Sequence, residues 1–435
     1  MKKIKWACIQ PLTGGMYLGA EAAIGHPAEW ILSYKGLDDI KCNKDGEITV
    51  VANEAYLNTY LKKKDRMPPY YQMDRVMFDP DLDNLEPDIY LGEKLKTPKY
   101  DGLDLVVAVP VCSGLSTSTI GTKEALMARN YNMLYLANLA LRKIKPKIYI
   151  FENAPTLMGQ RGDYLREEFE RLAEENDYGI IYYKTDTARH HNCQRRQRTF
   201  VLFVQKIKGE NYVPKMDFVD DHILPKDYFA NIPSGLPNDE LIISDIYNYL
   251  ILDFLKDKYG DNMFSVWTKD SAMSYVISNN LLDEFAEYIP KHENSTDDEK
   301  ENVLKYINHI KNKLAQNSGW FGADVKQCKD DYFPAVMYKT IPSILHPNKS
   351  RFCTVREMLE LMGMPRDFEW FGGRCNLGKI GQNVPVKTAE FIVGQAVNML
   401  ENWKNSARQK GTVYFYDNIR QTVSNFTQHE VNRLF

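Results

Sequence analysis

A cysteine that follows an apolar segment is the first candidate for chemistry in this 435-residue chain. The segment Leu103–Val109 reads LDLVVAV, and the motif VPVCSGLS places Cys112 just after it. Ligands of open α/β sheets bind at the carboxyl ends of strands, so a thiol there is placed to attack one. Pro110 stiffens the preceding backbone, and Ser113–Thr122 is rich in small residues that favour a mobile loop. We predict a nucleophile; the plain alternative is a buried core cysteine.

An acidic residue and two arginines accompany two other strand-like segments. Lys147–Phe151 ends directly before Glu152, whose carboxyl group could bind or protonate a ligand at the same edge of a sheet. Arg196 and Arg198 share one side of an extended chain, because side chains alternate with period two. Two guanidinium groups on one face suit planar oxygen-bearing ligands. The alternatives are a surface acid at a strand end and a basic surface run.

A pair of glycines in PLTGGMYLGAE forms the fourth candidate. Thr13, Gly14 and Gly15 lie between a strand-like segment, Ile4–Ile9, and an apolar-periodic segment, Met16–Ile24. Such a turn lets a cofactor approach the backbone N–H groups at the start of a helix. An ordinary strand–helix turn explains the same pattern equally well.

Short apolar runs alternate with helical stretches in the first half of the chain and must position these residues. Nearly continuous apolar runs indicate strands that are covered on both faces, as in a parallel sheet. The alternation predicts an α/β fold with a doubly wound, Rossmann-like sheet. The predicted strands are Ile4–Ile9, Trp30–Tyr34, Glu47–Ala52, Leu103–Val109, Lys147–Phe151, Gly179–Tyr183 and Thr199–Val204, and the predicted helices are Met16–Ile24 and Ala125–Ile144.

The pattern changes after residue 205, and we predict three parts: 1–205, 206–345 and 346–435. The middle part is richer in Asp, Asn, Tyr and Lys and carries proline-marked breaks. It should contain a helix over Asp245–Lys258 and another that starts at a capping box, Thr296 to Glu299, and ends near Gly319. The last part should contain the helices Thr354–Met362 and Lys387–Trp403, followed by a tail.

Composition excludes several classes of protein. Lys and Arg number 55 against 58 Asp and Glu, so a surface that is basic throughout is not expected, although a local basic cleft remains open. Seven cysteines without a C-x-x-C pair argue against a disulfide framework and a zinc ribbon. The cluster His190-His191-x-Cys193 has no partner ligands, so we expect no metal. Without a long apolar run, we expect a soluble cytoplasmic protein that does not enter a membrane.

The ordered set of motifs resembles the cytosine-specific DNA C5-methyltransferases. Cys112 lies 97 residues after Gly15 (15 to 112), and Glu152 lies 40 residues after Cys112 (112 to 152). The resemblance covers roughly Lys3–Gln205 and Pro342–Trp403. In chain order, the motifs are the glycine turn, P-x-C-S-G-L-S, E-N, Q-x-R-x-R from Gln194, R-x-x-T-x-R-E from Arg351 and I-G-x-N-V-P from Ile380.

The resemblance implies transfer of a methyl group from S-adenosylmethionine to C5 of a cytosine flipped out of double-stranded DNA. Cys112 matches the nucleophile that attacks C6, and Glu152 matches the carboxyl group that protonates N3 and reads the N4 amino group. Arg196 and Arg198 match arginines that hold the O2 side of the base and the catalytic loop. Residues 206–345 then correspond to a smaller, inserted target-recognition domain.

The cofactor site implied by the resemblance departs from the usual pattern. Gln10 and Leu12 occupy the places of a usual Phe-x-Gly, and Val111 stands where a proline usually precedes the nucleophile. A ribose-binding acid would fall near Tyr34, which is not acidic; Glu54 in VVANEAYL resembles it, displaced by an inserted hairpin. The other matches to the cofactor site are Thr13, Gly14, Gly15, Pro110, Asp88 (with Asp74 as its rival) and Asn383.

Alternative functions stay open at this point. One branch of the family modifies tRNA, but it carries a reduced variable region, so the long segment 206–345 favours DNA. The changes at Gln10, Leu12 and Val111 would suit a non-catalytic DNA-binding homologue or an enzyme with a modified donor. We expect a monomer, because flipping one base needs one active site. Such enzymes also occur in restriction–modification systems, which leaves room for a cognate restriction endonuclease as a partner.

Overall fold

A computed structural model of the chain describes most of its residues. The described residues are 3–75, 77, 85–111, 113–115, 128–207, 212–240, 246–263, 271–316, 325–326, 328, 331–337, 344–349, 351–404 and 408–425.

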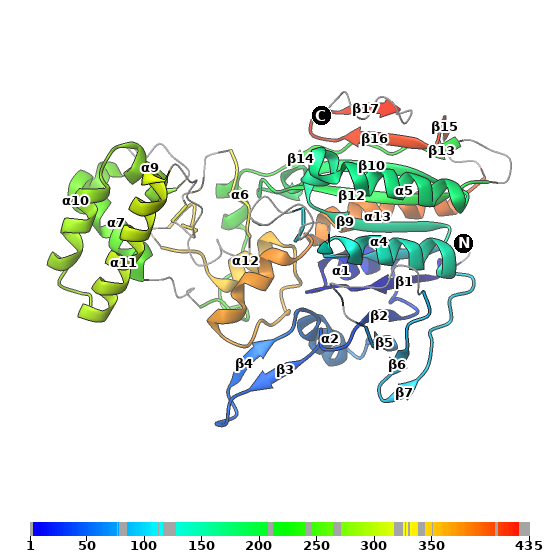
Figure 1. Cartoon of the computed structure of the whole chain (residues 1–435), viewed down its shortest axis with the longest axis horizontal. Coiled ribbons are helices and arrows are strands. Elements are labelled where there is room, and N and C mark those ends of the chain that lie inside the picture. The colour runs from blue at the N-terminus through cyan, green and yellow to red at the C-terminus, as the bar shows by residue number, and fades with distance from the viewer. Residues whose placement is uncertain are drawn as a thin grey trace.

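Eleven strands of the described chain form one sheet, in the order β17-β16-β10-β12-β9-β8-β1-β2-β5-β6-β7 (Figure 1). The five central strands β9, β8, β1, β2 and β5 are parallel, and β12 runs antiparallel between β9 and β10. The predicted doubly wound α/β sheet is therefore confirmed. The strands are β1 (Trp6–Ile9), β2 (Ile31–Tyr34), β5 (Tyr70–Met73), β6 (Ile89–Leu91), β7 (Lys94–Leu95), β8 (Leu105–Ala108), β9 (Ile148–Asn153), β10 (Tyr178–Asp186), β12 (Gln197–Gln205), β16 (Val413–Asp417) and β17 (Thr422–Asn425).

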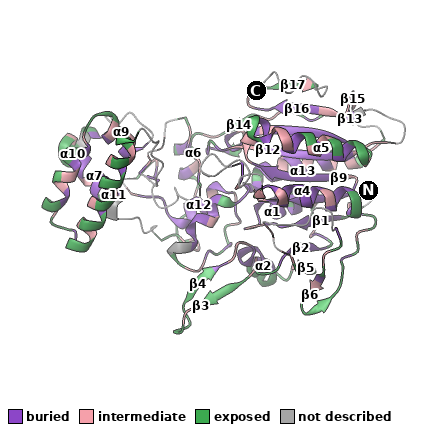
Figure 2. Ribbon diagram, in the orientation of Figure 1, coloured by how far each residue is buried: buried purple, intermediate pink, exposed green. Residues whose placement is uncertain are grey.

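Helices cover both faces of the sheet, and its central strands are buried (Figure 2). Alternate strand residues belong to two separate apolar cores. In β8, Leu105 and Val107 join the core under helices α1, α2 and α13, whereas Val106 and Ala108 join the core under α4 and α5. This double burial explains why the strand sequences are almost continuously apolar. The helices are α1 (Gly15–Ile24), α2 (Asn53–Lys63), α4 (Tyr131–Asn138), α5 (Asp163–Glu175) and α13 (Val386–Glu401).

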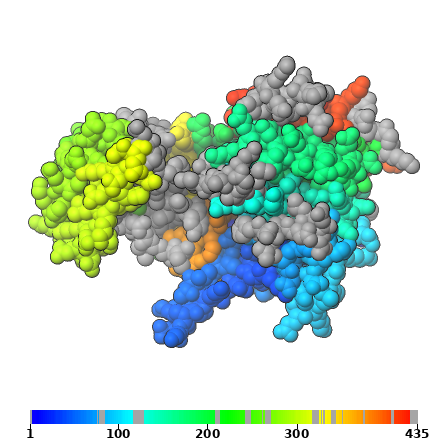
Figure 3. Space-filling model, in the orientation of Figure 1, coloured from blue at the N-terminus to red at the C-terminus, as the bar shows by residue number. Residues whose placement is uncertain are grey.

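A hairpin lies between β2 and α2, where the sequence analysis expected an inserted hairpin before Glu54. Its strands β3 (Ile40–Cys42) and β4 (Ile48–Val51) pair antiparallel and project from the body of the molecule (Figure 3). The base of the hairpin is fastened to the segment before Asn383: Val51 N–H donates to Asn376 Oδ1 at 3.2 Å, and Lys379 Nζ donates to the carbonyl of Val51.

A helical cluster lies at the end of the molecule opposite the sheet (Figure 1). Its apolar core is separate from the two cores of the sheet and is built from residues such as Phe254, Phe285 and Ile307. The predicted capping box from Thr296 to Glu299 is present. The cluster consists of α7 (Ile246–Tyr259), α9 (Ala272–Ser278), α10 (Leu282–Tyr288) and α11 (Asp297–Ala315), and α6 (Pro225–Ala230) and α12 (Val355–Leu361) lie between it and the sheet.

Two expectations differ from the structure. The predicted helix Ala125–Ile144 is, in its described part, α4 followed by a π-helical turn, Leu139–Ile144. The tail after residue 405 is not a plain extension, because β16 pairs parallel with β10 and adds β17 to the edge of the sheet. A further strand, β15 (Arg408–Lys410), pairs with β13 (Tyr212–Pro214).

Candidate active site

The carboxyl ends of the central strands bring the predicted motifs to one edge of the sheet. Ile9 in β1 pairs with Ala108 in β8, and Ala108 pairs with Phe151 in β9. The glycine turn, the segment that leads to Cys112, and Glu152 therefore emerge side by side, although the sequence spreads them over more than a hundred residues. Cys112 itself lies outside the described residues; its neighbours Val111 and Ser113 are described.

Glu152 and Arg198 form an ion pair at this edge. Arg198 Nε lies 2.7 Å from Glu152 Oε1, and the Glu152 side chain is only 8% exposed. The antiparallel pairing of β9 with β12, which aligns Glu152 with Phe200, places the two side chains together. Burial raises the pKa of Glu152, while the charges of Arg198 and then Arg196 lower it, and burial wins. The carboxyl group thus takes up a proton more readily than an exposed glutamate.

Arg196 contacts different groups from Arg198. It precedes β12 and is buried, and its guanidinium donates to three backbone carbonyls: those of Val336 at 2.5 Å, Gly381 at 2.7 Å and Asn383 at 3.0 Å. The two arginines therefore do not converge on one group. Arg196 joins the first strand-rich half of the chain to segments that follow the helical cluster.

The glycine turn and the last motif meet across the chain. Gly15 N–H donates to Asn383 Oδ1 at 2.7 Å, over a separation of 368 residues. A Cβ at Gly15 would lie 1.8 Å from the carbonyl oxygen of Val384, so only glycine fits there. Gly14 has φ +108, and Leu12, which stands in the usual place of a glycine, adopts φ +52. The left-handed backbone of the turn is thus retained with a leucine at one position.

Glu54, which was predicted to bind the cofactor, is a buried acid in the first turn of α2. Its carboxyl oxygens accept hydrogen bonds from Ser33 Oγ at 2.6 Å and Tyr70 Oη at 2.8 Å. Ser33 belongs to β2, so Glu54 reaches back past the inserted hairpin to the strand that the ribose-binding acid was predicted to follow. Burial raises the pKa of Glu54 to about 8.

The remaining predicted cofactor residues lie around the same edge. Pro110 is buried directly after β8. Asp88 and its rival Asp74 are both exposed and adjacent, with Asp74 N–H donating to the carbonyl of Asp88 at 2.9 Å. Asp74 also forms an ion pair with Lys35 at 2.8 Å. The assignment of a single adenine-binding acid stays a prediction.

Two residues that the sequence analysis did not select, Asn132 and Thr156, contact the cysteine-bearing segment, and Tyr34 is linked to it through Asn132. Asn132 Oδ1 accepts from Val111 N–H at 2.9 Å, and Asn132 Nδ2 donates to Tyr34 Oη at 2.8 Å. Thr156 Oγ1 donates to the carbonyl of Leu115 at 2.5 Å. Tyr34 was noted only for lacking a charge; its position at the end of β2 was the one available signal.

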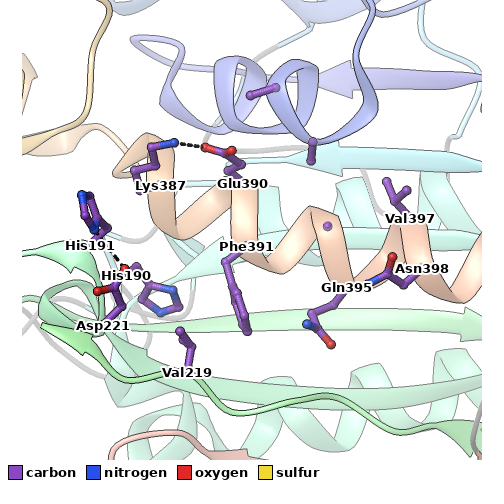
Figure 4. Close-up of a pocket in the computed structure, with 13 residues that line it drawn as sticks. His190, His191, Val219, Asp221, Lys387, Glu390, Phe391, Gln395, Val397 and Asn398 are labelled. Carbon is purple, nitrogen blue, oxygen red and sulfur yellow. Dashed lines mark hydrogen bonds and ion pairs between the residues drawn. The ribbon is translucent and has the colours of Figure 1, made fainter.

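A separate groove of about 560 Å³ lies between α1, α13 and the segment around His190 (Figure 4). His190 is neutral there, because burial lowers its pKa to about 3, and His191 contacts Asp221 at 2.9 Å. None of the predicted site residues is among its described lining residues. In the described chain, no three His, Cys, Asp or Glu side chains gather in a metal-binding arrangement. Nor does any described helix combine the length and apolar character needed to cross a membrane.

Three solved structures that resemble the chain are a DNA modification methyltransferase encoded within an E. coli prophage (18% identity, TM-score 0.49), the S. pombe Dnmt2 methyltransferase (13%, 0.46) and the Entamoeba histolytica methyltransferase EhMeth (12%, 0.48). The alignments cover 92%, 92% and 93% of this chain and 99%, 99% and 100% of those chains. No curated protein matches.

A family model described as C-5 cytosine-specific DNA methylase matches residues 79–398, well over half of the chain. The match includes Cys112, Glu152, Arg196, Arg198 and Asn383 and begins after the glycine turn and Glu54. The chain therefore belongs to the C-5 cytosine-specific DNA methylase family.

Proposed function

We propose that this protein methylates C5 of cytosine in double-stranded DNA through a covalent bond between Cys112 and C6 of the base. The observation that carries the proposal is the buried Glu152–Arg198 pair at the sheet edge where the segment leading to Cys112 also ends. A buried acid held by a guanidinium, beside a nucleophile, is the set of groups that activation of a pyrimidine ring requires.

Cys112 would act first. Its thiolate attacks C6 and forms a C–S bond, and the electron pair of the 5,6 double bond shifts so that C5 becomes nucleophilic. After C5 has gained the methyl group, a base removes the C5 proton, and the electron pair of that C–H bond restores the 5,6 double bond and expels Cys112 as a thiolate. The base must leave the stack for this attack, since C6 is not accessible within a duplex.

Glu152 would transfer a proton to N3 as the thiolate attacks and take it back when the ring is restored. Its raised pKa supports this role, because a buried acid can hold the proton that the ring needs. Arg198 would keep the carboxyl group oriented through its contact with Oε1. Arg196 has its guanidinium on backbone carbonyls, which supports a positioning role.

Enzymes of this family use S-adenosylmethionine, which supplies an electrophilic methyl group. The turn after β1 fits such a cofactor, because Thr13 Oγ1 and Gln10 Oε1 are buried there without a described hydrogen-bond partner. Orphaned polar atoms of this kind are costly unless a ligand satisfies them. Thr13, Gly14 and Gly15 would line the site, together with Glu54, Pro110, Asp88 and Asn383.

DNA is the substrate that the helical cluster favours. The cluster has a core of its own, distinct from that of the sheet, and such a separate body suits target recognition along a duplex. RNA, the substrate of another branch of the family, is the second candidate.

The proposal can be tested with purified protein and isotopically labelled S-adenosylmethionine. We expect label on C5 of cytosine in duplex DNA, none in total tRNA, and no transfer by Cys112→Ala. A Thr388→Val variant, which loses a buried hydroxyl far from Glu152 in sequence, serves as a control that keeps activity. Labelled tRNA with unlabelled DNA would contradict the DNA assignment, and full activity of Cys112→Ala would contradict the covalent mechanism.

A further inference from the structure

We propose that Asn132, Tyr34 and Thr156 form a clamp that positions the segment bearing Cys112. This inference rests on the proposed function for its catalytic consequence, but the clamp itself consists of contacts between described residues. Asn132 and Tyr34 secure the backbone before Cys112, and Thr156 secures the backbone three residues after it. The three are positioning residues, since they act through the backbone of the segment.

Asn132 is built into this position. It is fully buried in α4, and both ends of its amide are used: Oδ1 accepts from Val111 N–H at 2.9 Å, and Nδ2 donates to Tyr34 Oη at 2.8 Å. Tyr34 is 1% exposed at the end of β2. Such a chain of buried hydrogen bonds fixes each member more firmly than one bond alone. It joins three elements, β2, α4 and the segment after β8, at one point.

The contact compensates for a departure in the sequence. The family usually has proline before the nucleophile, and proline both limits the backbone and lacks an N–H group. Val111 carries an N–H, and leaving it unpaired near a buried site would be costly. Asn132 satisfies that group and restrains the backbone from outside, which is what the proline ring does from within.

The second arm of the clamp lies on the other side of Cys112. Thr156 follows the Glu152 motif, and its hydroxyl donates to the carbonyl of fully buried Leu115 at 2.5 Å. Arg166 in turn holds the short 3₁₀ helix Pro155–Met158 that carries Thr156, donating to the carbonyls of Leu157 at 2.5 Å and Gly159 at 3.1 Å. The clamp thus ties the nucleophile segment to the 3₁₀ helix that follows the proton donor, Glu152.

A double-mutant cycle between Val111 and Asn132 tests the clamp. Asn132→Leu removes the acceptor and leaves the Val111 N–H unpaired, whereas Val111→Pro removes the donor. We expect Asn132→Leu to lower kcat about tenfold with little change in KM, because the loss of one buried hydrogen bond misplaces the nucleophile. The double variant Val111→Pro/Asn132→Leu should recover part of that loss, because proline removes the Val111 N–H that Asn132→Leu leaves unpaired, while Tyr34 Oη still lacks its amide donor.

Matched controls separate positioning from general stability. Asn130→Leu removes a buried amide that donates to Tyr164 Oη at 2.7 Å and has no hydrogen bond to residues 111 and 113–115, the described part of the cysteine segment. It should leave kcat unchanged at a temperature where the protein stays folded. Thr156→Val should lower kcat, whereas Thr388→Val should not. Equal losses of kcat for the test and control variants would overturn the positioning role.

Hydrogen exchange makes the clamp testable even if the protein does not methylate DNA. In peptides that cover residues 107–115, the amides should exchange faster in Asn132→Leu than in the wild type or Asn130→Leu. If Asn132→Leu exchanges faster and the wild type does not methylate DNA, the clamp is kept and the proposed function is refuted. Unchanged exchange, or a double variant no more active than Asn132→Leu, would overturn the clamp.

Discussion

The ion pair between Glu152 and Arg198 sets the acidity of the proposed proton donor. Burial raises the pKa of Glu152 and Arg198 lowers it, so Arg198→Met should raise that pKa further. The reaction needs the protonated acid, so the alkaline limit of kcat/KM should move to higher pH while the maximal rate falls. A pH–rate profile measures both, with the exposed Arg195→Met as a control. An unchanged alkaline limit would show that Glu152 is not the titrating donor.

Glu54 should make the stability of the chain depend on pH. Its pKa is about 8 in the folded chain against an ordinary value of 4.5, so between those values the folded state holds a proton that the unfolded state has lost. The free energy of unfolding should therefore fall by up to about 1.4 kcal/mol per pH unit as the pH rises through this window. Glu54→Gln should remove this dependence. Denaturant unfolding at pH 5 and pH 8 checks it, and parallel behaviour of the two proteins would contradict it.

At the scale of elements, Arg196 fastens the start of β12 to two segments from the last third of the chain. Arg196 reaches these carbonyls from two separate nitrogens, Nη1 and Nη2, and the single nitrogen of a lysine cannot take both places, so Arg196→Lys should lower the free energy of unfolding by about 2–3 kcal/mol. The neighbouring Arg195 is exposed, and its guanidinium lies over the ring of Tyr332. Arg195→Lys should therefore change the free energy of unfolding little. Chemical denaturation of the two variants measures the difference; equal losses would remove the special role of Arg196.

The elements that could be predicted were those whose own residues show a local signal, such as an apolar run or a capping box. The apolar run of β8 and the capping box at Thr296 identify a buried strand and a helix start locally, and both are present. The strands after residue 407 were missed, because β16 is five residues long and takes its place from pairing with β10. Likewise, the period of two placed Arg196 and Arg198 on one face, but only tertiary contacts give them different partners.

The same limit applies to the site. The motif order selected both Glu152 and Arg198 as candidates, but their direct contact became evident only when β9 and β12 were paired. Tyr34 and Asn132 have no motif of their own, since their role depends on three elements that meet at Val111. Residues that act through the backbone of others leave no chemical signature in a single sequence.

At the scale of the whole molecule, the sheet and the helical cluster should separate chemistry from recognition. Replacing residues 246–316 with a flexible linker should abolish methylation of duplex DNA but preserve thermal stabilisation by S-adenosylmethionine, because the glycine turn and Asn383 lie outside the replaced segment. Differential scanning fluorimetry and a methylation assay measure the two properties. Retained methylation at the same sites would contradict this division.

The most direct test of the account is mass spectrometry of nucleosides digested from plasmid DNA. The plasmid would be propagated in cells that have no DNA methylation of their own. The cells would express the wild type, Cys112→Ala or the control Thr388→Val. The account predicts 5-methylcytosine with the wild type and Thr388→Val, and none with Cys112→Ala. Unmodified cytosine in DNA from all three strains, with each protein folded and present, would contradict cytosine methylation in DNA.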